Sequence, residues 1–237
     1  MKSDYEQTLD KNFDKALELC SKSYSNEDLI EFLKSGNITE KQFAALEISE
    51  LKTQNDAEVF LANLINCDGK IREAVAQKFS EFVNNNKYKN YFSQYPDILA
   101  KSTIDINANI SRMVIDSLAL LNDDNKFGKQ YSKQLVQYIK EAFEGLDKIV
   151  FRDKKYTINK QLFKLYWCLE GLNNYYNYLD KNTLYNILER TLKENEYTVR
   201  EKAAQILVKL TESIFEPLKS ELEKDNNYYV KRILKNS

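Results

Sequence analysis

Side chains that could perform nucleophilic or metal chemistry are few and far apart in this sequence. It contains no histidine, which removes the commonest general base and the commonest metal ligand of proteins. The three cysteines, Cys20, Cys67 and Cys168, lie 47 and 101 positions apart and form no CxxC pair. Zinc ligands are spaced much more closely, so no metal site is expected. Widely spaced cysteines in odd number are typical of a reducing compartment, and we expect a cytoplasmic protein.

Motifs for phosphate binding and acid–base catalysis are missing as well. The five glycines are isolated, so the chain has neither a GxGxxG turn nor a P-loop. Asp123 and Asp124 are adjacent carboxylates, but their segment, residues 122–125, has the composition of a turn. Serine and cysteine nucleophiles have no histidine to activate them. The sequence therefore predicts a protein that is not an enzyme and uses no cofactor.

The composition favours a folded chain of helices. Charged residues make up 30% and hydrophobic residues 43% of the 237 positions, which is not the composition of a disordered chain. Only 5 glycines and 2 prolines are present, too few for the turns of most β and α/β folds. No apolar stretch approaches the 18 or so residues of a membrane span, and the first residues lack the apolar core of a signal peptide. We expect no membrane association.

Charge is balanced overall but uneven along the chain. The net charge is −1, which gives no general attraction to nucleic acid or to an anionic membrane. Residues 1–60 carry 7 basic and 13 acidic side chains, whereas residues 123–160 carry 9 basic and 6 acidic ones. We interpret the acidic first quarter as solvated helix surface.

A twelve-residue pattern recurs along the chain. A starting residue is followed by small or apolar residues at offsets 4 and 5 and by apolar residues at offsets 8 and 11. In the clearest copy, which starts at Val199, these are Ala203, Ala204, Leu207 and Leu210. All of these offsets fall on one stripe of an α-helix. Copies start at positions 40, 71, 110, 158, 199 and 230, with 31 to 48 residues between them, a period typical of helical solenoids.

A partner helix is predicted between successive copies of the pattern. Turn-forming residues separate these segments from the repeated helices. We further expect one domain over residues 1–237, with a capping helix in residues 1–24 and a longer central hairpin in residues 123–157. The predicted partner helices are Ser25–Lys34, Asp56–Ile65, Tyr91–Lys101, Lys129–Leu146, Asn182–Lys193 and Phe215–Lys224.

The repeated helix resembles the second helix of a HEAT repeat. The resemblance rests on Val199-Arg200 followed by Ala203-Ala204, and on Ile71-Arg72 followed by Val75-Ala76. It covers about residues 25–237 and implies an all-α, right-handed α-solenoid of about six helical hairpins. Such repeats have a basic residue at offset 1, which forms a polar ladder between repeats. Lys41, Arg72, Arg200 and Lys231 fit this feature, whereas Ser111 and Asn159 depart from it.

The resemblance also implies which surface binds a partner, because the second helices of HEAT-like stacks line a concave face. The side chains opposite the core stripe lie at offsets 2, 6, 9 and 13. Most of them are polar with mixed signs, as expected for a solvated groove that is not built for phosphates. We therefore expect a protein partner at this face, and the candidate contacts there are Glu73, Gln77, Arg112, Asp116 and Gln205.

The segment Ile158–Leu172 departs from the other copies because it is apolar on every side. A helix of this kind is covered on all sides or forms part of an interface. One interpretation is that the preceding segment, residues 122–156, folds over it. The other is a binding patch centred on Trp167, since tryptophan and tyrosine often carry interface energy. The candidate contacts of that patch are Trp167, Lys160, Lys164, Tyr175 and Tyr176.

Three functions stay open at this level. The first is a non-catalytic scaffold or adaptor that holds a protein partner on its concave face. The second resembles the alkylpurine DNA glycosylases, which use the same scaffold, but the near-neutral charge speaks against a nucleic-acid partner. The third is similar to the HEAT-like phycobilin lyases, although no residue here points to chromophore chemistry. The first is the prediction that the residues favour.

Overall fold

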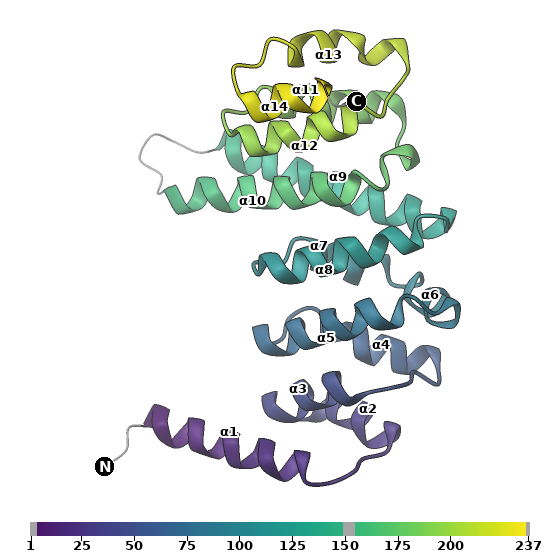
Figure 1. Ribbon diagram of the computed structural model, residues 1–237, viewed down its shortest axis with the longest axis vertical. Helices are drawn as coiled ribbons and strands as arrows, with labels where there is room; N and C mark the ends of the chain where they lie inside the picture. Colours follow the sequence, from purple (N-terminus) through teal and green to yellow (C-terminus); the bar gives the residue numbers. More distant parts are fainter. Residues whose placement is uncertain (1–3, 149–154, 236–237) are drawn as a thin grey trace. The chain divides into compact units, whose positions relative to one another are not determined.

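The computed structural model describes residues 4–148 and 155–235. These residues form fourteen α-helices and three 3-10 turns, without a strand (Figure 1). Helices account for most of the described residues. The chain divides into two compact units, residues 1–120 and residues 121–237. The predicted fold class, an all-α solenoid of helical hairpins, is confirmed, whereas a single domain over 1–237 stays a prediction.

The first unit consists of two layers of helices, one with α3, α5 and α8 and the other with α2, α4 and α7, and of a terminal helix, α1. Helix α5 packs between α3 and α8, and α4 packs between α2 and α7. Helix α1 packs against α3 at the end of this unit, where Lys15 and Glu40 form an ion pair of 3.2 Å. The helices are α1 (Asp4–Cys20), α2 (Asn26–Ser35), α3 (Ile38–Glu47), α4 (Gln54–Ala62), α5 (Gly69–Phe82), α6 (Asn86–Phe92), α7 (Pro96–Thr103) and α8 (Ala108–Leu118).

Capping residues fix where these helices begin. The hydroxyl of Ser25 accepts a hydrogen bond from the backbone N–H of Asp28, whose carboxylate accepts one in return from the backbone of Ser25. Thr53 and Asp56 form the same reciprocal pair at the start of α4. Each pair satisfies two backbone donors that the first helical turn would otherwise leave open. The helix start predicted at Ser25 is therefore correct.

A proline changes one predicted element. The segment Tyr91–Lys101 was expected to be a single helix, but it is divided between α6 and α7. Pro96 is the first residue of α7 and lacks the N–H that a continuous helix would need. Tyr95, just before it, is held out of the helical conformation with φ −120° and ψ 52°.

The second unit repeats the two-layer arrangement around longer helices. Helix α12 packs between α10 and α14, while α10 packs along α9, and α11 contacts α12 and α13. Residues 125–147, expected to belong to a hairpin within 123–157, form one helix, and its hairpin partner is α10. The helices are α9 (Asn125–Asp147), α10 (Lys155–Leu172), α11 (Lys181–Leu192), α12 (Tyr197–Leu207), α13 (Glu216–Leu222) and α14 (Tyr228–Lys235).

Aromatic side chains fill much of both cores. In the first unit Phe60, Phe79 and Phe92 are completely buried, with the rings of Phe79 and Phe92 4.9 Å apart. In the second unit the rings of Phe127, Tyr131 and Tyr175 pack together at 4.8 to 5.9 Å. Edge-on and stacked pairs at these distances add to the stabilisation from burial.

An arginine links neighbouring repeats in each unit, half-buried in the first (Arg72) and buried in the second (Arg200). Arg72 on α5 makes a two-pronged ion pair with Asp105, at 2.6 and 3.1 Å, in the turn before α8. Arg200 on α12 does the same with Asp225 before α14, at 2.7 and 3.1 Å. Both guanidinium groups also donate to backbone carbonyls of the turn that precedes their own helix. The predicted ladder of basic residues is thus present at these two steps.

The same position is different in the other repeats. The hydroxyl of Ser111 on α8 donates a hydrogen bond to the carbonyl oxygen of Asp105 at 3.1 Å, in the turn before its own helix. Lys41 on α3 donates to the amide oxygen of Asn63 at 3.2 Å instead of pairing with a carboxylate. Asn159, the corresponding residue of α10 in the copy predicted to start at Ile158, is exposed. Both departures from the predicted pattern, Ser111 and Asn159, therefore lie on helices that lack the arginine link.

Candidate functional site

We call the register of the twelve-residue pattern on a helix, given by its starting residue, the frame of that helix. Helix α10 does not follow the frame that the sequence predicts for it. With the frame starting at Ile158, the side chains of Leu162, Phe163 and Tyr166 should be buried, but all three are half-buried. By contrast, the residues at the predicted core offsets of α5, α8 and α12 are all buried. The completely buried side chains of α10 are Leu165, Cys168, Leu169 and Leu172.

A frame that starts at Lys164 describes α10 correctly. Offsets 4, 5, 8 and 11 from this residue are then Cys168, Leu169, Leu172 and Tyr175, all of them buried. The neighbouring helix agrees with this register, because Lys202, three residues after the start of the α12 copy, bonds to Glu170 at 2.6 Å. Its ammonium also lies 5.0 Å from the centre of the Tyr166 ring. The frame of α10 therefore begins six residues later than predicted.

The later frame leaves the first turns of α10 without a neighbour from α12. Helix α10 has nine residues before its frame starts at Lys164, whereas α12 has two before Val199. The beginning of α10 accordingly extends beyond the beginning of α12 (Figure 1). Apolar residues on these turns that would pack against the next repeat stay partly exposed. This length mismatch is the physical origin of the site.

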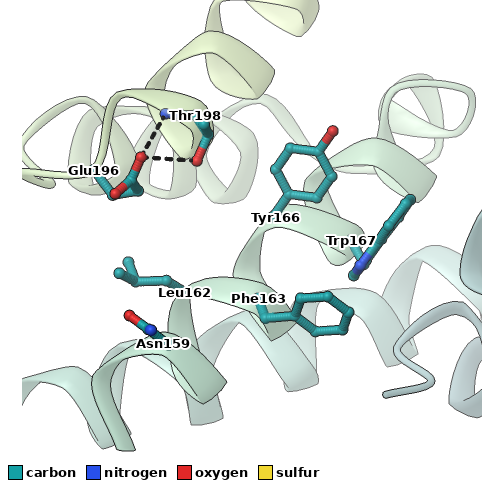
Figure 2. A pocket seen from close by; sticks show the side chains of 7 residues that line it. All are labelled: Asn159, Leu162, Phe163, Tyr166, Trp167, Glu196 and Thr198. Carbon is teal, nitrogen blue, oxygen red and sulfur yellow. Dashed lines mark hydrogen bonds between the residues drawn. The ribbon is translucent and has the colours of Figure 1, made fainter. Parts of the chain in front are cut away.

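A hollow of about 330 Å³ lies where α10 extends past α12. Figure 2 shows the rings of Phe163, Tyr166 and Trp167 grouped on consecutive turns of α10, with the start of α12 facing them. Tyr166 meets the indole edge-on at 5.0 Å and Phe163 meets it at 6.0 Å. The residues that line the hollow are Asn159, Leu162, Phe163, Tyr166, Trp167, Glu196 and Thr198.

The polar rim of the hollow comes from the first turn of α12. Glu196 caps this helix: one carboxylate oxygen accepts the backbone N–H of Thr198 at 3.4 Å and its hydroxyl at 3.1 Å. Among the described residues, no lysine or arginine forms an ion pair with Glu196. Burial alone would lower the pKa of Lys202, but its bond to Glu170 raises that pKa above the ordinary value. The ammonium next to Tyr166 therefore stays charged.

The groups at the hollow are suited to binding and poorly suited to catalysis. Its polar members are one amide, the hydroxyls of Thr198 and Tyr166 and one carboxylate, and the contact of the Thr198 hydroxyl with the Glu196 carboxylate belongs to the cap of α12. The nearest thiol, Cys168, is completely buried, and desolvation raises its pKa far above the ordinary value. The Trp167 indole N–H is also buried and has no hydrogen-bond partner. An aromatic hollow with a polar rim is the usual form of a recognition site.

Two of the aromatic residues predicted as partner contacts are not accessible. Trp167 is 5% exposed and Tyr175 is 1% exposed, so neither can present the broad patch that the sequence suggested. The rings of Phe163 and Tyr166, on the same helix, pack against the Trp167 ring, and Tyr175 packs in the core with Tyr131. The interpretation of an exposed tryptophan patch is thereby corrected.

The other predicted contacts of the second unit differ in exposure. Lys160 is exposed on the first turns of α10. Lys164 is half-buried and pairs with Glu141 on α9 at 3.2 Å. Tyr176 is half-buried beneath Lys209, whose ammonium lies 5.8 Å from its ring centre. Gln205 on α12 accepts a hydrogen bond from Lys202 at 3.3 Å. None of these four lines the aromatic hollow.

The predicted contacts of the first unit lie on two adjacent helices. Glu73 and Gln77 are exposed on α5, and Arg112 and Asp116 are exposed on α8, which packs against α5. Their spacing of four residues on each helix places them on outward-facing stripes, as predicted. No hollow with these residues in its lining occurs among the described pockets, so they remain predicted contacts.

Sequence reasoning missed the residues that form the hollow. Leu162, Phe163 and Tyr166 were assigned to the core because they fit a stripe that starts at Ile158. The available signal was the apolar character of the whole segment, which has more apolar positions than one packed stripe needs. Glu196 and Thr198 carried no signal of their own, because helix-capping residues of this kind occur at many helix starts.

A second hollow, of about 350 Å³, lies in the first unit but offers little for recognition. Its central amide, Asn63, is 3% exposed and donates to the carbonyl oxygens of Leu33 and Val59 at 3.0 and 2.9 Å. The amide oxygen accepts from Lys41 and from the thiol of Cys67. These groups are already paired with one another, which is the pattern of a structural hydrogen-bond network.

Within residues 4–148 and 155–235, no group of three or more histidine, cysteine or acidic side chains is placed to hold a metal ion. In the same ranges no helix is both long enough and apolar enough to cross a bilayer.

Comparison with known proteins identifies the fold alone. No family model matches the sequence, and no characterised protein is detectably similar to it in sequence. Among solved structures, an engineered protein from the Northeast Structural Genomics Consortium superposes with a TM-score of 0.53 and 12% identity, over 90% of this chain and 96% of that one. This chain has the fold of an α-solenoid of stacked helical hairpins.

Two further structures match with lower scores. The archaeal HEAT-like repeats protein from Thermococcus onnurineus gives a TM-score of 0.49 at 12% identity, over 90% of this chain and 78% of that one. Computationally designed armadillo repeat proteins for modular peptide recognition give 0.45 at 12% identity, over 89% and 97%. At such identities the function of this chain has to be argued from its own site.

Proposed function

We propose that this protein is a non-catalytic interaction scaffold, in which the hollow between α10 and α12 holds an apolar side chain of a protein partner. The observation that carries the proposal is the uncovered apolar surface of Leu162, Phe163 and Tyr166 at the start of α10. Burying such surface stabilises a complex by about 25 cal/mol per Å². The cytoplasm is the expected compartment.

The geometry of the hollow supports a side chain rather than a free small molecule. Its volume of about 330 Å³ is near the lower end for ligand pockets, and it is open on one side. Glu196 and Thr198 at the rim offer oxygen atoms to backbone N–H groups of a segment that crosses the start of α12. An apolar anchor surrounded by a polar rim is the usual anatomy of a protein interface.

The two other functions have no supporting observation at the hollow. A nucleotide-binding groove would need unpaired cations beside aromatic rings, but Lys202, the cation nearest Tyr166, is already paired with Glu170. No side chain of the hollow is suited to chromophore transfer chemistry. The described residues therefore favour the scaffold role.

Selection of binding peptides from a random displayed library would test the proposal directly. Peptides selected on the unaltered protein should share one apolar or aromatic position. Their binding should lose about 2 kcal/mol or more with Phe163→Ala, the size expected at the centre of an interface. Ile106→Ala removes an equally apolar side chain that is 77% exposed in the first unit, and it should leave the same peptides bound.

Two outcomes of this selection would contradict the proposal. One is a set of peptides that bind Phe163→Ala as tightly as the unaltered protein. The other is binding that weakens steeply with added salt, because steep salt dependence indicates a polyanion-like charge interaction rather than burial of an apolar anchor.

A further inference from the structure

Helix α9 carries a row of unpaired lysines along its exposed side. Lys126, Lys129, Lys133 and Lys140 are all exposed. Steps of 3, 4 and 7 residues separate them, so they fall within a narrow arc of the helix surface. At 1.5 Å per residue the row is about 21 Å long. We call these four residues the lysine row.

The lysine row differs from the rest of the described surface because it groups several lysines that make no ion pair. Some exposed lysines elsewhere have a carboxylate partner on the same surface, as in the pairs Lys22–Glu18 and Lys193–Glu189, and others, such as Lys70 and Lys224, stand singly. None of the four lysines of the row makes an ion pair. The acidic residues near the end of α9 are already engaged, Glu141 with Lys164 and Glu144 with Lys148.

An uncompensated row of this kind works against the stability of its own helix. Like charges three and four residues apart, such as Lys129 and Lys133, repel each other and destabilise the helix. The helix persists because Phe127, Tyr131 and Leu135 on its other side are completely buried. The repulsion would be relieved by a partner that places negative charges along the row.

From this arrangement we infer that the lysine row binds an acidic α-helical segment of a partner protein. Steps of 3, 4 and 7 residues correspond to axial separations of about 4.5, 6 and 10.5 Å, which are those of an α-helix. A helix lying along α9 with glutamates or aspartates at the same steps would meet each ammonium in turn. This surface is separate from the hollow, and the inference goes beyond the proposed function.

The same observations disfavour the other polyanions. The row has no arginine, the side chain that forms bidentate hydrogen bonds with phosphates. It also has no exposed aromatic ring on which a base could stack. Between the lysines the exposed positions are Gln130 and Gln137, so no apolar side chain is available to insert into a lipid surface. The lysine row therefore shares only its positive charge with surfaces that bind nucleic acids or membranes.

The test uses a synthetic helical peptide with glutamates at steps of 3, 4 and 7 residues and measures binding by fluorescence anisotropy. The peptide should bind the full chain, and Lys129→Gln with Lys133→Gln should weaken binding at least about tenfold. The matched control, Lys70→Gln with Lys224→Gln, removes two exposed, unpaired lysines away from the row and should change affinity less than about twofold. Glutamine has nearly the helix propensity of lysine, and circular dichroism checks that α9 stays folded.

Each remaining outcome would overturn the inference. These outcomes are absence of peptide binding, equal weakening by the control pair, and equal binding of a peptide with the same glutamates at scrambled spacing. The last would mean attraction by net charge without a docking geometry. Tighter binding to oligothymidylate or to phosphatidylserine vesicles, lost in the Lys129→Gln and Lys133→Gln variant, would assign the row to a nucleic acid or a membrane instead.

Discussion

Helices α5 and α10 occupy equivalent places in their hairpins but differ in how fully the fold covers them. On α5 the five side chains of the repeated stripe, from Ile71 to Phe82, are all buried between α3 and α8. On α10 the stripe starts later, and Leu162 and Phe163 on its first turns stay partly exposed. The difference follows from how far α10 extends past its neighbour: α10 has nine residues before its frame starts, whereas α12 has two. Surface available for binding therefore arises where a helix is longer than the next one.

The largest expected effect is the difference in stability loss between one substitution on α5 and the corresponding substitution on α10. Phe79 on α5 and Tyr166 on α10 have the same offset in the frames predicted from the sequence. Phe79→Ala should destabilise the protein by about 3–5 kcal/mol because its side chain is completely buried. Tyr166→Ala should cost about 1 kcal/mol, since half-buried positions lose less. Urea unfolding of both variants measures the contrast.

The corrected frame supplies the control for this pair. Leu172 takes the place of Phe79 when the α10 frame starts at Lys164, and Leu172→Ala should cost about 2–5 kcal/mol. Equal losses for Tyr166→Ala and Phe79→Ala would mean that the predicted frame was right and that the hollow is filled.

The next effect concerns the arginine–aspartate pair, of which each unit has its own. Arg200→Met leaves the carboxylate of Asp225, whose side chain is 9% exposed, without its cation. Loss of one member of a buried pair costs about 3–5 kcal/mol, and the partial exposure here favours the lower end. Lys193→Met breaks an exposed pair with Glu189 and should cost less than about 1 kcal/mol.

The link also predicts a dependence on pH. Burial alone would raise the pKa of Asp225, but hydrogen bonds from Arg200 and from the backbone of Asn227 hold it below the ordinary value. The stabilisation is therefore present above the unfolded pKa of about 3.9 and is lost as pH falls through the lower folded pKa. The difference in stability between the unaltered protein and Arg200→Met should shrink below about pH 4. A difference that stays constant there would assign the loss to packing.

A smaller effect tests how closely the second helices approach one another. Ala203 and Ala204 on α12 are completely buried. Ala204→Leu should overpack this contact and cost about 1–3 kcal/mol, measured as a lower thermal midpoint. Asn159→Leu enlarges an exposed side chain at the rim of the hollow and should stay within about 0.5 kcal/mol. A neutral Ala204→Leu would mean that α12 is rotated from the observed orientation.

Periodicity made the architecture predictable, but not the site. Each of the six repeated helices was located from the sequence, because one apolar stripe per helix is required wherever hairpins stack. The break at Pro96 was missed, although proline at the first helical position was a readable signal. The frame of α10 was misplaced because an apolar helix offers two stripes that fit the same pattern, one from Ile158 and one from Lys164. Which of them is buried depends on where α12 begins, and that is a property of the neighbour.

The last prediction uses Trp167, the single tryptophan of the chain, as a reporter on the two interpretations of α10. With 5% of its surface exposed, it should emit at short wavelength and be shielded from acrylamide. The rings of Phe163 and Tyr166 on the same helix lie 6.0 and 5.0 Å from the indole and shield part of it. Phe163→Ala should therefore shift the emission to the red and increase quenching while leaving stability within about 1 kcal/mol. Ile106→Ala, in the other unit, should leave the spectrum unchanged. Long-wavelength emission from the unaltered protein would instead mean that the indole is accessible and could contact a partner directly.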